Sequence, residues 1–227
     1  MTGKEHKLDN PVWHSLSDIH KEYAVDYKAI KFYNPAYCPF GGSIDTEKSI
    51  SGITEYGNII DSFFVVGEKP LLDDSVIIKK NLICNQMILE GEIDIELTEQ
   101  IIPLESENQK NDLFDLVSLV QPGYFRKKTA DLGRYFGIYK DNKLIAASGE
   151  RMQMNEFTEI SAIVTHPDHT RNGYAKQLIK HTTDQVFSGN KIPYLHVLES
   201  NIGAVGLYEK LGFTTRRKIS FWKLGMV

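Results

Sequence analysis

Apolar residues in the second half of the chain switch between helical and strand spacing. Residues 107–120 place Leu113, Leu116 and Val120 on one helical face, and a Gln-Pro-Gly helix stop follows. Residues 160–164 are almost continuously apolar, as in a central strand. The predicted elements are a helix over 107–120, a hairpin of 135–139 and 144–148, a strand through 160–164, a helix over 173–187, a strand over 192–200, a helix over 201–212 and a last strand over 215–224. This order predicts a mixed sheet with crossover helices, hence an α/β fold.

The first hundred residues favour strands. Runs rich in β-branched and aromatic residues occur at 25–33, 61–67, 75–89 and 93–98, and turn-forming segments separate them. Residues 10–24 form one possible helix. We expect a boundary after residue 100, which divides the chain into a strand-rich domain, 1–100, and an α/β domain, 101–227.

Charge divides along the same boundary. The chain has 227 residues, of which 41% are hydrophobic and 11% aromatic, enough for a buried core. Residues 1–100 hold 9 Lys and 17 Asp or Glu, whereas residues 101–227 hold 17 Lys or Arg, including all six arginines, and 13 Asp or Glu. The basic second half fits an anionic ligand or a solvated face equally well. An acidic first half without a basic, aromatic stripe argues against nucleic acid as a partner.

Other features limit location and metal chemistry. The polar N-terminus lacks a signal-peptide pattern, and no run of 18 apolar residues occurs, so we expect a cytoplasmic protein without a membrane partner. Cys38 and Cys84 have no CxxC spacing and no histidine at metal-ligand spacing, so no metal site is expected. Two reduced, buried thiols are the favoured interpretation, with a disulfide as the alternative.

The loop before the helix at 173–187 has the chemistry of an anion site. A helix start leaves about four backbone N–H groups unpaired and carries a partial positive charge. Here the donors are the amides of Arg171, Asn172, Gly173, Tyr174 and Ala175, and Gly173 allows a ligand close to the backbone. A merely capped helix start is the alternative. Neither GxxxxGK[ST] nor GxGxxG is present, so a nucleoside-triphosphatase loop or a dinucleotide fingerprint is not supported.

A second motif changes the interpretation of the first. Asn201 opens a short helix on which Tyr208 lies one turn beyond Ala204, a position that packing alone would also explain. Together, residues 165–178 and 193–213 closely resemble the GNAT N-acetyltransferase superfamily, especially the branch like the C-terminal domain of glycine N-acyltransferases. The residues that match the family pattern in order and nearly in spacing are Val164, Pro167, Gly173, Ala175, Leu178, Asn201, Ala204, Leu207, Tyr208, Gly212 and Phe213.

The resemblance implies a GNAT fold, with a mixed, mostly antiparallel sheet flanked by helices, and acetyl-CoA as co-substrate. It implies that the amides of residues 171–175 hold the coenzyme A pyrophosphate. Backbone groups of Ile163, Val164 and Thr165 would pair with the pantetheine arm, and Asn201 and Tyr208 would lie near the thioester sulfur. Thr170 departs from the family pattern, which usually has Gln or Arg there, and this puts one phosphate contact in doubt.

Two side chains are candidates for proton transfer. A phenol with a reference pKa of ~10 stays protonated at neutral pH, so Tyr208 is suited to protonate the leaving thiolate. Glu159, at the start of the strand that carries the thioester site, is the candidate base; a solvated strand-start carboxylate is the alternative. His196 and Glu199 are weaker candidates for the same role.

We therefore expect an N-acetyltransferase that acts on a primary amine of a small molecule or peptide. The alternative is a catalytically weak acyl-CoA-binding or sensing module. A third interpretation treats residues 1–100 as a partner-binding domain with the second half as its scaffold. By analogy with the tandem halves of glycine N-acyltransferases, residues 1–100 resemble a degenerate GNAT-like half that sets acceptor specificity.

Overall fold

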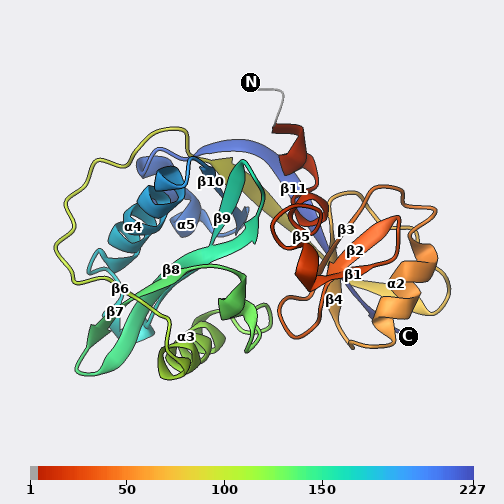
Figure 1. Cartoon of the computed structure of the whole chain (residues 1–227), viewed down its shortest axis with the longest axis horizontal. Helices are drawn as coiled ribbons and strands as arrows, with labels where there is room; N and C mark the ends of the chain where they lie inside the picture. The colour runs from red at the N-terminus through yellow and green to blue at the C-terminus, as the bar shows by residue number, and fades with distance from the viewer. Residues whose placement is uncertain (1–4) are drawn as a thin grey trace.

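The computed structural model describes residues 5–227 and places their strands in one mixed sheet of 11 strands (Figure 1). The strand order is β1-β2-β3-β4-β11-β5-β10-β9-β8-β7-β6. The strands are β1 (Ala24–Asp26), β2 (Ile30–Tyr33), β3 (Phe40–Ser43), β4 (Phe63–Val66), β5 (Val76–Ile88), β6 (Ile102–Pro103), β7 (Tyr135–Lys140), β8 (Lys143–Gln153), β9 (Phe157–Thr165), β10 (Ile192–Leu198) and β11 (Thr214–Met226). The helices are α1 (Pro11–Ser15), α2 (Ile50–Gly57), α3 (Glu107–Val120), α4 (Tyr174–Ser188) and α5 (Ile202–Lys210).

Two 13-residue strands, β5 and β11, join the two sides of the molecule. In Figure 1, β1–β4 and α2 lie on one side of this pair, and β6–β10 with α3–α5 lie on the other. Strand β5 comes from the first half of the chain yet pairs with β10, while β11 comes from the second half yet pairs with β4. Each half therefore contributes a strand to the other. The sheet runs without a break across the expected boundary at residue 100, and the division into 1–100 and 101–227 stays a prediction.

The elements expected in the second half are present. Helix α3 begins with a capping box, in which the Ser106 hydroxyl accepts a hydrogen bond from the backbone N–H of Gln109 and the Gln109 side chain accepts one from the N–H of Ser106. The hairpin turn uses Asp141 and Asn142 with φ of 49° and 61°, as a two-residue turn requires. Among the described strands, only β9–β10 and β3–β4 are parallel. The predicted α/β class, with a mixed, mostly antiparallel sheet flanked by helices, is confirmed.

Helices α3 and α4 cover opposite faces of β8. Successive side chains of a strand point to opposite faces. Ala147 packs in the cluster that contains Leu113 and Leu116 of α3, whereas its neighbour Ala146 packs with Leu178 of α4. The strands between these helices are thus buried on both faces, which explains why residues 160–164 are almost continuously apolar.

The first half follows the sequence pattern less closely. The expected helix over 10–24 is α-helical only over Pro11–Ser15, because the chain then turns to bury His20, which is 2% exposed. Its Nδ1 lies 2.9 Å from the Tyr33 hydroxyl, so a polar cluster and not a continued helical face fixes this segment. The expected strand over 25–33 is divided by a turn with Lys28 at φ 65° into β1 and β2.

The run at 93–98 is not a strand either. Its backbone is tied to α4, since the Gln177 side-chain oxygen accepts hydrogen bonds from the N–H groups of Thr98 and Glu99. Ile93 packs in the cluster that contains Ile179 and Leu211. The alternating apolar residues of this run therefore cover a helical layer instead of extending the sheet.

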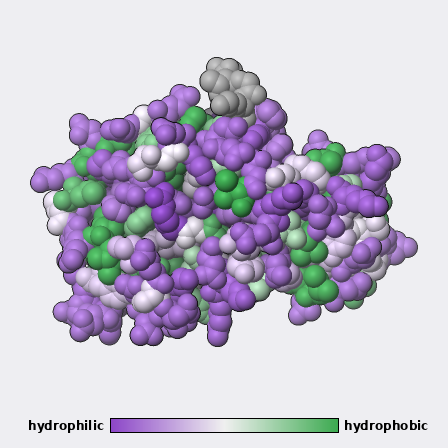
Figure 2. All heavy atoms as spheres, viewed as in Figure 1, coloured by the Kyte–Doolittle hydropathy of each residue, from purple (hydrophilic) through white to green (hydrophobic). Residues whose placement is uncertain are grey.

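Hydrophilic residues predominate on the face drawn in Figure 2, and hydrophobic residues appear there as separate patches. Cys38 and Cys84 are both buried and free. No helix within residues 5–227 has the length and apolar character needed to cross a membrane. Within the same residues, no group of three or more His, Cys, Asp or Glu side chains could hold a metal ion.

Candidate active site

A cleft opens where the parallel strands β9 and β10 separate. The strands pair only over residues 157–159 and 192–194. Beyond this point they line a cavity of about 300 Å³, together with α5, the turn after α3, β11 and, from the first half of the chain, β3 and β5. Ligands of open α/β sheets bind beyond the carboxyl ends of such strands. The separation of β9 and β10 therefore marks the candidate site.

A bulge distorts β9 inside this cleft. Ala147 pairs with Val164 and Gly149 with Ser161, so Ala162 and Ile163 together face a single residue of β8. Ala162 adopts a left-handed backbone with φ 50°. A bulged residue leaves its backbone polar groups outside the regular ladder. The bulge thus frees backbone groups next to the cavity, where the family resemblance predicts the pantetheine contacts.

The loop between β9 and α4 is shaped as an uncapped helix start. Gly173 precedes α4 with φ 79°, and it makes no side-chain capping hydrogen bond. Arg171 is also left-handed, with φ 66°, and its exposed side chain makes no hydrogen bond or ion pair with residues 5–227. The Thr170 hydroxyl donates to the carbonyl of Pro167, so it stabilises the loop itself. The first amides of α4 and a free guanidinium remain available to an anion.

Helix α5 supplies the two polar side chains that the second motif predicted. The Asn201 side chain accepts a hydrogen bond from the Ala204 N–H at 3.2 Å and so caps the helix. Tyr208 is 7% exposed and lines the cleft. Burial raises the pKa of its phenol to about 12, which keeps the hydroxyl protonated at neutral pH. The neutral phenol therefore carries a proton that it can donate, although the raised pKa makes it a weaker acid than an exposed tyrosine.

Glu159 is a buried, paired carboxylate. Arg151 Nε lies 2.7 Å from Oε2 and Arg151 Nη2 lies 2.8 Å from Oε1. His196 Nδ1 lies 2.8 Å from Oε1. Burial tends to raise the Glu159 pKa, but the charge of Arg151 and the hydrogen bonds from His196 and Arg151 outweigh it and lower the pKa to about 2. The carboxylate stays ionised, and its low basicity favours an anchoring role over proton abstraction.

The hydrogen bonds around His196 determine where its ring proton lies. The Gln86 oxygen accepts from Arg216, so the Gln86 amide nitrogen donates both to the carbonyl of Leu8 and to His196 Nε2, at 3.1 Å. His196 consequently accepts at Nε2 and donates from Nδ1 to Glu159. The buried Gln86 belongs to β5, so this network connects the cleft to the first half of the chain.

The structure gathers part of the predicted set in one place. The predicted residues that line the cleft are Glu159, Ile163, His196, Asn201 and Tyr208, whereas the weaker candidate Glu199 is not part of the lining. Val164 points away from it into the cluster that contains α3, and Thr165 ends β9 opposite Ala146. Residues 171–173 belong to the loop before α4 and residues 174–175 open the helix, all outside the cavity lining. These positions leave the backbone contacts of 163–165 and 171–175 as predictions.

Sequence reasoning missed two parts of the cleft. Arg151 interrupts the mainly apolar strand 144–152, and a charge inside such a strand was a usable signal for a buried ion pair. The aromatic wall from Phe40, Tyr124 and Phe221 carried no usable signal, because these residues lie far apart in sequence and meet only through the exchange of β5 and β11.

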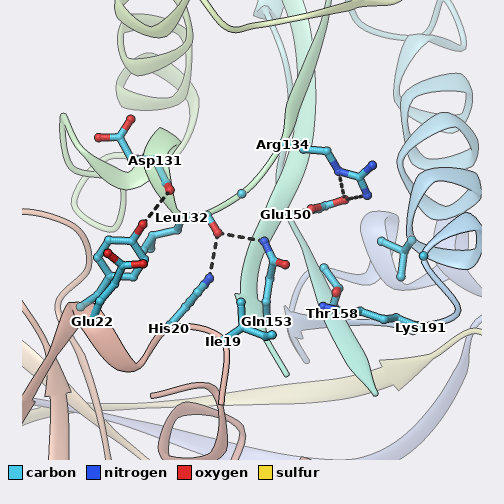
Figure 3. Close-up of a pocket in the computed structure, with 14 residues that line it drawn as sticks. Ile19, His20, Glu22, Asp131, Leu132, Arg134, Glu150, Gln153, Thr158 and Lys191 are labelled. Atoms are coloured by element: carbon cyan, nitrogen blue, oxygen red, sulfur yellow. Dashed lines mark hydrogen bonds and ion pairs between the residues drawn. The ribbon is translucent and has the colours of Figure 1, made fainter. Parts of the chain in front are cut away.

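A second, polar hollow of about 430 Å³ lies at the paired ends of β9 and β10 (Figure 3). Thr158 and Lys191 line one side of it, and the Glu150 carboxylate accepts two hydrogen bonds from Arg134. On the other side, the Leu132 carbonyl lies 2.9 Å from His20 Nε2 and accepts from Gln153. This hollow flanks the C-terminal end of α4, about 22 Å along that helix from Gly173.

Comparison with known proteins identifies the family. Residues 99–213, half of the chain, match the model of the acetyltransferase (GNAT) family. The chain belongs to the GNAT family. It is therefore an acyltransferase, and the family takes its acyl group from acyl-CoA and passes it to an amine. The narrower resemblance to glycine N-acyltransferases stays a prediction.

Solved GNAT structures share the fold over almost the whole chain. A protein from Novosphingobium aromaticivorans, described as an acetyltransferase of the GNAT family, is 27% identical, with a TM-score of 0.89 over 98% of this chain and 99% of that one. A GCN5-related N-acetyltransferase from Kribbella flavida is 14% identical, with a TM-score of 0.66 over 100% of this chain and 96% of that one. A tandem GNAT protein from clavulanic acid biosynthesis is 10% identical, with a TM-score of 0.53 over 86% and 77%. The curated proteins gave no match.

Proposed function

We propose that this GNAT protein transfers an acetyl group from acetyl-CoA to a primary amine of a small molecule or peptide. The observation that carries the proposal is a buried, protonated Tyr208 in the cleft between the separated strands β9 and β10. Acyl transfer from a thioester needs a neutral amine, stabilisation of the tetrahedral oxyanion and a proton for the departing thiolate. Tyr208 meets the third need.

Two features support a coenzyme site between the bulge in β9 and the start of α4. The uncapped start of α4 offers the amides of residues 171–175 to a pyrophosphate, and Arg171 adds a full positive charge. The bulge at Ala162 leaves backbone groups of Ile163 outside the ladder, where they can accept the pantetheine arm and stabilise the oxyanion. In this proposal the backbone groups of Val164 and Thr165 also contact the pantetheine arm. The proposed reaction uses no metal.

The chemical step is a direct attack. The amine nitrogen attacks the thioester carbonyl carbon, and the carbon–sulfur bond breaks as Tyr208 gives its proton to the sulfur. The nitrogen then loses its surplus proton through water, which restores the phenol. In this scheme Glu159 acts as a positioning residue: it remains ionised and holds His196 against the cleft wall through Nδ1.

Thiol release tests the proposal against its alternative, a weak acyl-CoA-binding module. The Thr170 hydroxyl donates its proton to the carbonyl of Pro167 and so cannot also donate it to a phosphate, an observation that favours the module. We expect acetyl-CoA to bind and an amine panel to release coenzyme A thiol. Tyr208→Phe should lower turnover while coenzyme affinity is retained. Tight binding without thiol release for any amine would leave only the module.

A further inference from the structure

We infer that the acceptor is a weakly basic aromatic amine, which reaches the cleft already neutral and rests its ring on Tyr124. Tyr124 is the half-buried member of an aromatic wall whose other members, Phe40 and Phe221, lie behind it almost fully buried. This inference rests on the proposed acetyl transfer and adds the substrate class. Three properties of the cleft support it: the aromatic character of this wall, the absence of an unpaired charge and the lack of a side chain free to take a proton among the described residues that line the cleft.

The wall opposite β9 is aromatic. Phe40 of β3 and Phe221 of β11 meet edge to face, with ring centroids 5.5 Å apart, and both are at most 5% exposed. Tyr124 packs on the same group through Phe64, and Leu82 of β5 lines the cavity beside them. Edge-to-face and offset contacts favour an incoming aromatic ring over an alkyl chain of similar size.

The cavity offers no free carboxylate to an ammonium group. Among residues 5–227, the charged side chains that line the cavity are Arg151 and Glu159. They pair with each other through two hydrogen bonds. Acidic residues of the first half lie elsewhere, so their excess does not create a cation site here. A polyamine or a lysine side chain would lose hydration in this cleft without gaining a partner.

The same walls lack a proton acceptor. An alkylammonium must lose a proton before it can attack, and Glu159 has both oxygens engaged. His196 Nε2 already accepts from Gln86, whose amide is fixed by Arg216 and Leu8. Burial keeps the Cys84 thiol protonated by raising its pKa to about 12. An amine that is neutral in solution avoids this requirement altogether.

The polar hollow in Figure 3 is the contrasting case. Lys191, Arg134 and Glu150 line it, so this chain does build a charged pocket. That pocket, however, adjoins the C-terminal end of α4 and does not include Tyr208. The acceptor that meets Tyr208 therefore faces the aromatic wall and not the charged one.

The test compares amines of similar size and different basicity. Aniline and 4-methylaniline should release thiol from acetyl-CoA at pH 7, with kcat/KM nearly constant from pH 6 to 8. Cyclohexylamine and benzylamine should react more slowly at pH 7, and their kcat/KM should rise about tenfold per pH unit while the ammonium form dominates. Spermidine should react poorly throughout.

A variant pair tests the wall itself. Tyr124→Leu should lower kcat/KM for aniline about three- to tenfold, while acetyl-CoA affinity is unchanged. Tyr37→Leu, which alters a half-buried tyrosine outside the cleft, should leave kcat/KM unchanged. Equal or faster reaction of the alkylamines at pH 7 would overturn the inference and leave acetyl transfer standing. No release with any amine would refute the proposed function, and the inference would fall with it.

Discussion

Two strand–helix–strand units of this chain share a topology but not a chemistry. In β3–α2–β4 and in β9–α4–β10, a helix connects two neighbouring parallel strands. The loop before α4 carries Arg171 and the left-handed Gly173 and leaves the helix start uncapped. The loop before α2 carries Asp45, Glu47 and Lys48 instead, and its N-cap residue Ser49 likewise makes no side-chain capping hydrogen bond. The difference suggests that one unit suits an anion and the other repels it.

Side chains of the loop before α2 form hydrogen bonds within the loop and with neighbouring residues, although none of them caps the helix. The Asp45 carboxylate accepts from the Lys48 N–H, and the buried Ser49 hydroxyl makes hydrogen bonds with Ala29, Asp45 and Ser43. A hollow of about 270 Å³ lies beside this loop, and Asp9, Asp45 and Glu68 line it. A pyrophosphate would meet carboxylates there. We therefore propose that residues 1–100 are a degenerate GNAT-like half that supplies Phe40, Leu82 and Cys84 to the cleft and places β5 beside β10.

Replacing Tyr208 by Phe should have the largest effect on acetyl transfer in the cleft beside β9–α4–β10. The variant keeps the ring that packs in the α5 cluster and removes only the proton donor. We expect kcat to fall roughly 10²- to 10⁴-fold, the usual contribution of a positioned acid, with coenzyme affinity little changed. Steady-state thiol release and equilibrium binding measure the two effects. Tyr139→Phe, on the surface beside Asp112, is the matched control, and unchanged turnover in Tyr208→Phe would eliminate the acid role.

Glu159→Gln should destabilise the protein by about 3–5 kcal/mol, because it leaves the buried Arg151 charge without its partner. Glu99→Gln is the control, because it removes the carboxylate of a surface ion pair with Lys140. It should lower the free energy of unfolding by under about 1 kcal/mol. Urea unfolding measures both. A loss for Glu159→Gln as small as that of the control would show that the ion pair does not support the cleft.

The same carboxylate predicts a pH dependence. The Glu159 pKa is lowered from its ordinary value of 4.5 to about 2 in the folded chain. A lowered pKa contributes stability above pH 4.5, and this contribution is lost as pH falls toward 2. The free energy of unfolding should therefore drop more between pH 4.5 and 2 in the wild type than in Glu159→Gln. Parallel curves for the two proteins would contradict the assignment.

Gly173→Ala should weaken acetyl-CoA binding about tenfold. An alanine at φ 79° is strained by roughly 1–2 kcal/mol, and its Cβ would lie 3.1 Å from the Lys176 side chain. Gly203→Ala in α5 meets no atom within 4 Å and is the control. Calorimetric titration of both variants gives the affinities. Unchanged affinity in Gly173→Ala would remove this loop from the coenzyme site.

Arg171→Ala should have the smallest effect. A single exposed charge at a helix start contributes about 0.3–1 kcal/mol, so we expect a two- to fivefold loss of acetyl-CoA affinity that shrinks at high salt. Lys48→Ala, in the loop before α2, should change nothing. An equal loss in both variants would indicate that general charge, and not the α4 loop, attracts the coenzyme.

The sequence predicted the second half well because its signals are local. Helix periodicity, the Ser106 cap and the Asp141-Asn142 turn act within a few residues, and each is present as expected. The exchange of β5 and β11 could not be predicted, because any strand with that apolar pattern could pair with several others. The His20 cluster and the Glu159–Arg151 pair depend on side chains that meet only after folding, and hydrophobic spacing says nothing about them.

Coenzyme stoichiometry tests most directly the claim that only β9–α4–β10 holds acyl-CoA. Calorimetric titration of acetyl-CoA into the full chain should give one site per chain. That site should weaken about tenfold in Gly173→Ala and stay unchanged when Asp45 and Glu47 are replaced by Asn and Gln. Two sites per chain, or one site that responds to the Asp45 and Glu47 changes and not to Gly173→Ala, would contradict the account.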